Sequence, residues 1–166
     1  MKAPRTLAAS LALSASVLVG IALNEGYTDH AVRPVQGDVP TIGFGTTEGV
    51  RIGDKTTPPR ALVRLLQDAD KTAQAVRRCA PVPMHQYEFD AFVSLAYNIG
   101  PTAFCKSTLV KELKAGNYAD ACGQILRWTY FQGKDCAAPE NARLCGGLAA
   151  RRQREFFMCD GGQYGK

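Results

Sequence analysis

The chain has 166 residues, a formal net charge of +5 and 46% hydrophobic residues. This length suits one domain, or one compact pair of lobes, with a real core, and the apolar content excludes wholesale disorder. The mild positive charge suits a polyanionic partner such as a cell wall or an outer-membrane lipid. The sequence has no run of lysine and arginine with interleaved aromatic residues, which argues against a nucleic-acid-binding protein.

The N-terminus carries the basic residues Lys2 and Arg5, followed by the uncharged residues 7–23. As a helix this apolar run would be roughly 25 Å long, close to the lower limit for spanning a bilayer. Many of its residues are small or hydroxylated, so insertion into lipid is only weakly favourable. Three interpretations follow: a signal peptide cleaved at residues 14–16, a permanent anchor, or a segment that inserts, exports the chain and later leaves the bilayer. We favour the third, because the apolar run continues past the cleavage site and is a poor anchor.

Residues 23–47 hold the candidate chemistry. Glu25 follows the apolar run directly, which places it at a helix end lining a cleft. Glycoside hydrolysis needs such an acid, together with a second group that positions a water or stabilises the positive charge on the sugar. Asp38 and Thr41 are candidates for that group, because they precede Gly43-Phe44-Gly45, a pattern typical of a tight β-turn. From residue types alone, the alternative is that Glu25 is a helix-end charge and Asp38 a turn former.

Helical spacing of apolar residues predicts most of the remaining elements. The sequence predicts short strands near residues 33–52, an amphipathic helix over 58–78, a second helix over 85–98 stopped by Gly100-Pro101, a third around 109–113 ended at Gly116, a fourth around 119–126, a loop over 132–147, and a last helix over 148–158. The predicted fold class is therefore α+β, with a small N-terminal lobe that contains short strands and a C-terminal helical lobe. The predicted division is an N-terminal segment of residues 1–23 and a domain of residues 24–166.

Six cysteines lie scattered at positions 79, 105, 122, 136, 145 and 159. None has CxxC spacing and only two histidines are present, which argues against a zinc site. An even number of cysteines behind an export-like N-terminus predicts disulfides in an oxidising compartment, with buried free thiols in a cytosolic protein as the alternative. The one pair that we predict is Cys136–Cys145, which would close a proline-containing loop.

Several motifs occur together in one order: Glu25-Gly26-Tyr27, the run from Thr41 to Thr47, residues 87–100, Ser107-Thr108-Leu109, Trp128, and residues 147–152. In this order they resemble the phage lysozyme family typified by T4-type endolysins, over nearly all of the chain after residue 24. The resemblance implies a lysozyme-like fold whose two lobes enclose a cleft. It also implies a muramidase that cuts the β-1,4 bond between N-acetylmuramic acid and N-acetylglucosamine in peptidoglycan, using a Glu…Asp…Thr triad.

By motif, Glu25 matches the family's proton donor and Thr41 the residue that helps to place the nucleophilic water. The aspartate does not match in position, because Arg33, Pro34 and Val35 occupy the region where the family has it. The available carboxylates are Asp38, beside the turn, and Asp29, on the chain just leaving the helix. We expect Asp38; if neither serves, Glu25 and Thr41 act alone.

Arg151 or Arg152 resembles the family's arginine that pairs with the catalytic glutamate from the last helix. The alternative is a solvated basic helix face. The resemblance implies no metal and no organic cofactor, because acid catalysis with a held water needs none.

The weakly hydrophobic start resembles that of signal-anchor-release endolysins, which are exported and tethered in the inner membrane until it depolarises. This implies the host export machinery and the inner membrane as partners, a holin as functional partner, and a monomer that later acts in the periplasm and binds no nucleic acid. No cysteine precedes Cys79, so a thiol within the segment cannot drive activation. We therefore expect topological control, with the enzyme inactive while tethered and active once released and refolded. The remaining alternatives are a lytic transglycosylase, which forms an anhydro product, and a catalytically inactive wall-binding protein on the same fold.

Overall fold

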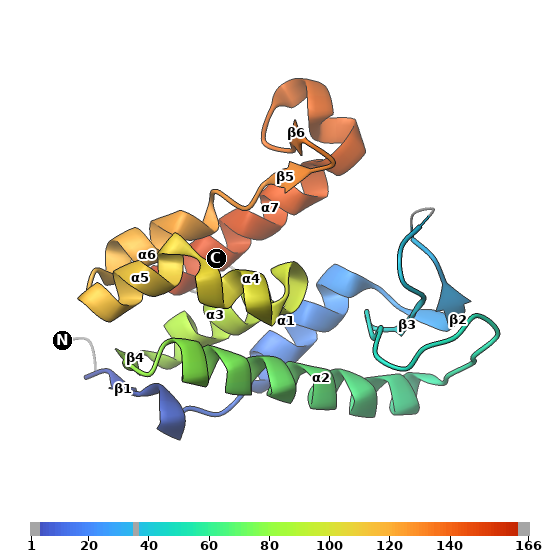
Figure 1. Cartoon of the computed structure of the whole chain (residues 1–166), viewed down its shortest axis with the longest axis horizontal. Helices are drawn as coiled ribbons and strands as arrows, with labels where there is room; N and C mark the ends of the chain where they lie inside the picture. The colour runs from blue at the N-terminus through green and yellow to red at the C-terminus, as the bar shows by residue number, and fades with distance from the viewer. Residues whose placement is uncertain (1–3, 35–36, 163–166) are drawn as a thin grey trace. The chain divides into compact units, whose positions relative to one another are not determined.

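The computed structural model describes residues 4–34 and 37–162, so the predictions that involve Lys2 and Val35 fall outside the described residues. The chain divides into two compact units (Figure 1): unit 1 comprises Met1–Ala12 and Thr72–Lys166, and unit 2 comprises Leu13–Lys71. The fold is of the predicted α+β class, with three two-stranded sheets and a majority of helix in the described part of the chain.

Unit 2 begins with helix α1, Ala15–Glu25, which is capped by Ser14 through a hydrogen bond from the Val17 N–H to Oγ at 3.1 Å. Of the apolar residues 7–23, the folded chain places 15–23 in α1, whereas Leu7 belongs to a short strand and Ala8–Ser10 to a 3-10 turn. Among the described residues, no helix is long and apolar enough to cross a bilayer.

Two antiparallel strands follow α1 in unit 2: β2, Thr28–Val32, and β3, Thr41–Gly43. The expected strand region of 33–52 contains β3 but starts too late for β2. Backbone hydrogen bonds to the 54–56 loop hold β2 on its other side, from Ala31 N–H to Asp54 O and from Thr56 N–H to Asp29 O. Such long-range pairing leaves no local signal in the polar sequence of β2.

Helix α2, Pro58–Cys79, runs from unit 2 into unit 1 and confirms the helix predicted over 58–78. In unit 1, α3, Gln86–Ile99, confirms the helix predicted over 85–98, and α5, Thr108–Ala115, and α6, Tyr118–Ile125, confirm the next two. Helix α4, Pro101–Lys106, was not predicted, because Pro101 was interpreted as a stop. Proline is tolerated in the first helical turn, and here it begins the next helix.

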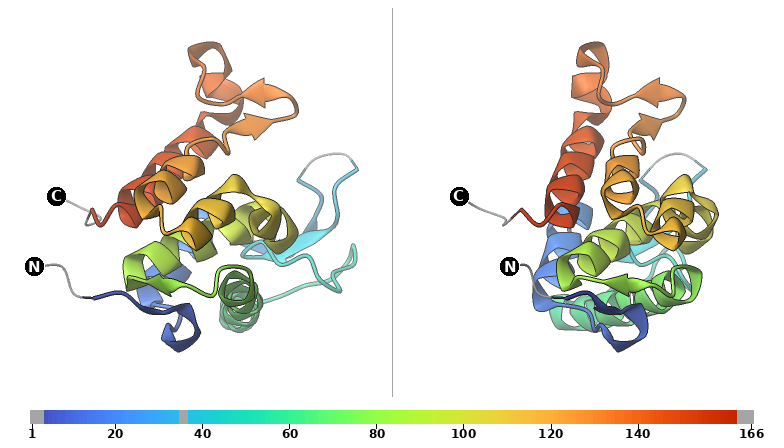
Figure 2. Two further views of the ribbon diagram at one scale, coloured as in Figure 1. Left: turned by 60° about the vertical axis from the view of Figure 1, so that its left-hand side comes forward. Right: turned by 90° about the vertical axis from the view of Figure 1, so that its left-hand side faces the viewer.

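The last helix, α7, spans Ala142–Cys159 and contains a non-helical residue at Cys145. The loop predicted over 132–147 is therefore wrong at its end, where the first turn of α7 lies before Gly146 and Gly147. The rest of that region holds the hairpin of β5, Tyr130–Phe131, and β6, Lys134–Asp135, and a 3-10 turn at Pro139–Asn141. Figure 2 shows this hairpin beside the end of α7 that lies away from the C-terminus.

Helix α3 forms the centre of unit 1. Its residues from Glu88 to Ala96 are all buried, and it packs against α4 and α7. Strand β1, Thr6–Leu7, pairs antiparallel with β4, Pro83–Met84, just before α3.

Three disulfide bonds join cysteines of unit 1. Cys136–Cys145 confirms the predicted pair, and the structure adds Cys79–Cys105 and Cys122–Cys159. The alternative of buried free thiols is wrong, because all six cysteines of the sequence are paired.

Candidate active site

Glu25 is the last residue of α1, so its predicted place at a helix end is confirmed. The helix ends there because Gly26 adopts a positive φ of 70° while its N–H donates to Ala22 O at 3.1 Å. This geometry directs the chain from α1 into β2 within two residues. Glu25 is therefore held at a fixed junction between a helix and a sheet.

The predicted β-turn at residues 43–45 is also present. The Ile42 and Thr46 backbones exchange two hydrogen bonds, at 2.9 and 3.1 Å, across Gly43, Phe44 and Gly45. Gly45 has a φ of 82°, and a Cβ built on it would lie 3.1 Å from Oε2 of Glu25. A glycine at this position therefore lets the turn close directly on the Glu25 carboxylate.

A second glycine fixes the turn from its other side. A Cβ on Gly43, which also has a positive φ, would lie 2.9 Å from the Cβ of Ala61 on α2. The Thr46 hydroxyl adds a hydrogen bond of 2.7 Å to Oδ2 of Asp68, also on α2. The turn is thus clamped to the first half of α2. Sequence reasoning missed Thr46 and Asp68 in this role, because their pairing depends on tertiary structure and not on local spacing.

Thr41 begins β3 and lies opposite Val32 of β2, and its hydroxyl donates to Val39 O at 3.3 Å. Asp38 is exposed and lies three residues before Thr41. Glu25, Asp38 and Thr41 all belong to unit 2, where the Glu25 carboxylate occupies the space that a side chain at position 45 would need.

The alternative carboxylate, Asp29, lies on β2 and is bound to its neighbour. His30 Nδ1 and Asp29 Oδ1 are 2.6 Å apart, and this hydrogen bond lowers the pKa of the Asp29 carboxyl below its ordinary value. Asp29 is therefore an ionised, exposed group already engaged by an imidazole.

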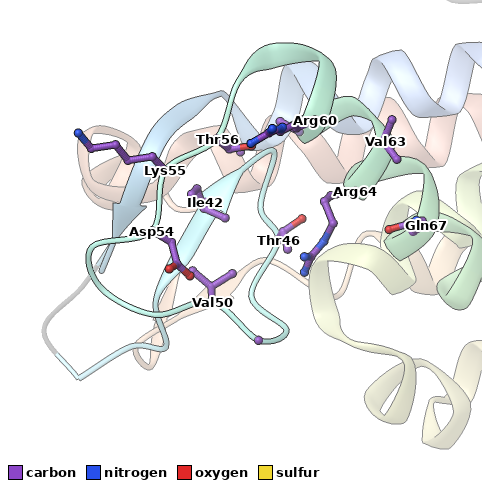
Figure 3. A pocket seen from close by; sticks show the side chains of 13 residues that line it. Ile42, Thr46, Val50, Asp54, Lys55, Thr56, Arg60, Val63, Arg64 and Gln67 are labelled. Atoms are coloured by element: carbon purple, nitrogen blue, oxygen red, sulfur yellow. The ribbon is translucent and has the colours of Figure 1, made fainter.

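A pocket of about 460 Å³ lies in unit 2 between the hairpin and the first turns of α2 (Figure 3). Ile42, Gly43 and Thr46 line it from the hairpin, and Arg60 and Arg64 line it from α2. Glu25, Asp38 and Thr41 are not among its lining residues. This pocket is therefore separate from the candidate active site, although the two share the turn at 43–46.

The two candidate arginines lie on α7 and are buried, so the solvated basic face is wrong for both. Arg151 donates to Oε1 of Glu155 at 3.1 Å, and Arg152 Nη1 lies 2.7 Å from Oε2 of the same carboxylate. The Ser94 hydroxyl of α3 also donates to Glu155, at 2.7 Å, and Arg152 donates to the Asn98 side chain. Together these contacts form a buried ionic network that joins α7 to α3.

The family model described as "Phage lysozyme" matches residues 22–155 of the chain. One relative, an endolysin of Acyrthosiphon pisum secondary endosymbiont phage 1, is 36% identical over 69% of this chain and 75% of its own length. A SAR-endolysin of Pseudomonas phage phiKMV is 33% identical over 87% of this chain and 86% of its own length.

A solved structure, an endolysin from Escherichia coli O157:H7 phage FAHEc1, superposes with a TM-score of 0.76 at 34% identity. The match covers 95% of this chain and 98% of that one. Both the glutamate and the glycine turn lie inside the matched family region, as does the α3–α7 network.

Proposed function

Because this chain belongs to the phage lysozyme family, we propose that it is an endolysin that hydrolyses the β-1,4 bond between N-acetylmuramic acid and N-acetylglucosamine in peptidoglycan. Such cleavage of the host cell wall causes lysis. Residues 24–166 form the muramidase domain, and residues 1–23 carry the export segment.

In this proposal Glu25 donates a proton to the glycosidic oxygen as the bond to the sugar breaks. Thr41 helps to hold the water that attacks the other side of the anomeric carbon, and Asp38 is the second carboxylate. We prefer Asp38 to Asp29 because Asp38 precedes β3 and the turn directly, whereas the Asp29 carboxylate is engaged by His30.

One observation carries the proposal most directly: the turn at residues 43–45 closes on the Glu25 carboxylate and is itself clamped to α2. A catalytic acid must be held in one position relative to the bond that it protonates, because misplacement by about 1 Å costs up to 100-fold in rate. A charge that merely ends a surface helix would not require a glycine in the facing turn, whereas here an added Cβ at Gly45 would lie 3.1 Å from Oε2 of Glu25.

The second part of the proposal concerns timing. We propose that residues 7–23 first reside in the inner membrane, after export by the host machinery, and that their release into the periplasm allows α1 to form. Holin-dependent depolarisation would trigger this release. Two relatives named SAR-endolysins match most of this chain, those of phage phiKMV and of Enterobacteria phage P21. The folded state supports a second environment for this segment, because Val19 and Leu23 of α1 are 59% and 80% exposed.

The experiment for the catalytic part compares Glu25→Gln with a matched control, Glu140→Gln, in the exposed 3-10 turn before α7. Purified proteins are added to chloroform-treated Gram-negative cells, and clearing is followed by turbidity. We expect Glu25→Gln to lose at least about 100-fold in rate, as for removal of a general acid, and Glu140→Gln to clear normally. Normal clearing by Glu25→Gln would contradict the role of Glu25 as the catalytic acid, whereas failure of the wild-type protein itself to clear the cells would favour a wall-binding protein.

Mass spectrometry of the murein fragments distinguishes hydrolysis from the transglycosylase alternative. Hydrolysis adds a water, so the products end in reducing N-acetylmuramic acid. An anhydro-muramic product would show that no water is used and would contradict the role given to Thr41.

A further inference from the structure

Residues 5–12 form a strap on unit 1, made of the short strand β1 and a 3-10 turn at Ala8–Ser10, although in the sequence they overlap the proposed export segment. Thr6 and Leu7 pair with Met84 and Pro83, and the Ala8 N–H donates to Val82 O at 3.2 Å. Ala8 is only 1% exposed. The strap is thus built into the fold by sheet pairing and burial.

Arg5 makes the strongest contacts of this strap. Its Nε donates to both carboxylate oxygens of Glu88, at 3.2 and 3.0 Å, and its Nη2 donates to Oε1 at 2.7 Å. The guanidinium carbon lies 3.7 Å from the centroid of the Tyr118 ring. These contacts raise the pKa of Arg5 above its ordinary value, chiefly through the hydrogen bond to Glu88. The edge of the planar guanidinium thus binds the Glu88 carboxylate through two N–H groups, while its face stacks on the Tyr118 ring.

The burial of the Glu88 carboxylate explains why Arg5 binds there. It is 3% exposed and lies in the first turn of α3, where its Oε2 also accepts from the His85 N–H at 2.8 Å. A buried carboxylate is costly unless a cation compensates its charge. Arg5 provides that cation from a position 83 residues away in the sequence.

The other end of the strap is held by two side chains from unit 1. Arg77 donates to Leu11 O through Nε and Nη2, at 3.1 and 2.7 Å. Gln86 donates to Ala12 O at 2.8 Å. These donors bind main-chain carbonyls, so the contacts do not depend on the side chains of Leu11 and Ala12. The surface of unit 1 made by β4, Glu88, Tyr118, Arg77 and Gln86 thus binds the strap by its Arg5 side chain at one end and by its backbone at the other.

We propose that this surface is a docking site that captures residues 5–12 when they leave the bilayer, and that the Arg5–Glu88 pair retains them there. The inference rests on the proposed export and release of residues 7–23. While that segment spans the membrane, about 30 Å of hydrocarbon separates Arg5 from the periplasmic body, and Arg5 cannot reach Glu88. After release, return to the membrane requires breaking the ion pair and the sheet pairing together. The basic residue that marks the cytoplasmic side of the tethered segment thus becomes the residue that makes release one-way.

The test uses Arg5→Lys, which keeps the positive charge needed for membrane topology but loses the bidentate fork. Glu88→Gln removes the carboxylate charge from the other side. The matched control is Arg78→Lys, at an exposed position of α2. Amide hydrogen exchange of the full-length, detergent-free protein is measured at Ala8, whose N–H donates to Val82 O just before β4, and at Gly100, whose N–H donates to Ala96 O at the C-terminus of α3.

We expect exchange at Ala8 to be at least about 10-fold faster in Arg5→Lys and Glu88→Gln, with Gly100 unchanged, because the strap opens locally while the body stays folded. The Arg78→Lys protein should match the wild type at both amides. Unchanged exchange at Ala8, or equal acceleration at Ala8 and Gly100, would overturn the docking role of Arg5.

An intact-mass measurement on protein recovered from the periplasm completes the test. Recovery of chains that still contain residues 5–12 is the expected result, and loss of these residues by cleavage would overturn the inference. None of these readouts depends on murein cleavage, so they are independent of the Glu25→Gln experiment. A failure of docking would leave the muramidase proposal intact, and the reverse also holds.

Discussion

Helices α1 and α3 are close in length but differ in how much of their surface is buried in the fold. Between Ala15 and Glu25, α1 is apolar almost throughout, yet it buries only Val17 and Ile21. Helix α3 buries every residue from Glu88 to Ala96, including two carboxylates and Ser94, because the polar groups Glu88 and Ser94 have bonded partners. The apolar character of α1 therefore exceeds what its folded environment uses. The proposed stay in lipid before folding would give that excess a physical reason.

The largest expected effect contrasts a core position of α3 with an exposed position of α1. Phe92 is fully buried against Phe104, with ring centroids 6.3 Å apart. Phe92→Ala should lower the free energy of unfolding by about 3–5 kcal/mol, because it leaves a cavity. Val19→Ala on α1 should change it by less than about 0.5 kcal/mol. Urea unfolding measures both, and comparable losses would contradict the difference drawn between the two helices.

The next largest loss of stability is expected when the ionic network between α3 and α7 is broken. Glu155→Gln would leave the buried guanidinium groups of Arg151 and Arg152 without their shared carboxylate charge. We expect a loss of about 3 kcal/mol in the free energy of unfolding, the lower end for breaking a buried ion pair. Glu140→Gln, at an exposed position, is the control and should unfold like the wild type. If both variants unfold alike, the network contributes only packing.

The sequence predicts those structural features that arise from local residue patterns, and it does not predict those that depend on contacts between distant segments. The periodicity of α2 and α3 and the glycine turn at 43–45 are local patterns, and the structure confirms them. Cys136–Cys145 was predicted because it would close the proline-containing loop between its two cysteines, whereas Cys79–Cys105 and Cys122–Cys159 join distant segments that only the fold brings together. The Thr46–Asp68 clamp was missed for the same reason.

The N-terminal segment shows the same limit most clearly. Composition predicts a membrane-compatible run over residues 7–23, and it gives no sign that residues 5–12 form a strap on unit 1. Their partners, from Arg77 to Tyr118, are set by tertiary contacts with no counterpart in the local sequence. In the candidate site, the positions of Glu25 and of the turn are confirmed, while the catalytic roles of Glu25, Asp38 and Thr41 stay predictions.

A smaller effect on stability, with a larger one on activity, is expected at the end of α1. Gly45→Ala places a Cβ 3.1 Å from Oε2 of Glu25 at a φ of 82°. The strained backbone should cost about 1–2 kcal/mol of folding free energy. Displacement of the carboxylate should lower the clearing rate by about 10-fold or more. Gly49→Ala, which also has a positive φ but has no neighbour within 4 Å of the added Cβ, is the matched control. Equal activity of the two variants would show that the contact with Glu25 does not matter.

Substitutions on the exposed face of α1 should have little effect on the stability of the folded protein. Val19→Ser and Leu23→Ser together are expected to change the unfolding free energy by less than about 1 kcal/mol, because both side chains are mostly exposed. In cells the same pair should weaken membrane retention and bring lysis forward. Membrane fractionation before lysis measures the retention, and an unchanged membrane fraction would argue against a bilayer role for this face.

The most direct test of release-controlled lysis makes the segment more hydrophobic without disturbing the folded enzyme. Ala15→Leu with Ser16→Leu changes two exposed positions; it removes the Ser14–Ser16 hydroxyl hydrogen bond but keeps the bond from the Val17 N–H to the Ser14 hydroxyl that caps α1. The control, Thr102→Leu with Gln153→Leu, adds the same side chains at exposed positions of α4 and α7.

The measurement is the time of lysis after induction, together with the clearing rate of each purified protein in the absence of membranes. We predict delayed lysis and a larger membrane fraction for the α1 pair only, with clearing rates equal to that of the wild type for both pairs. Lysis on the wild-type schedule by the α1 pair would contradict control by release from the membrane.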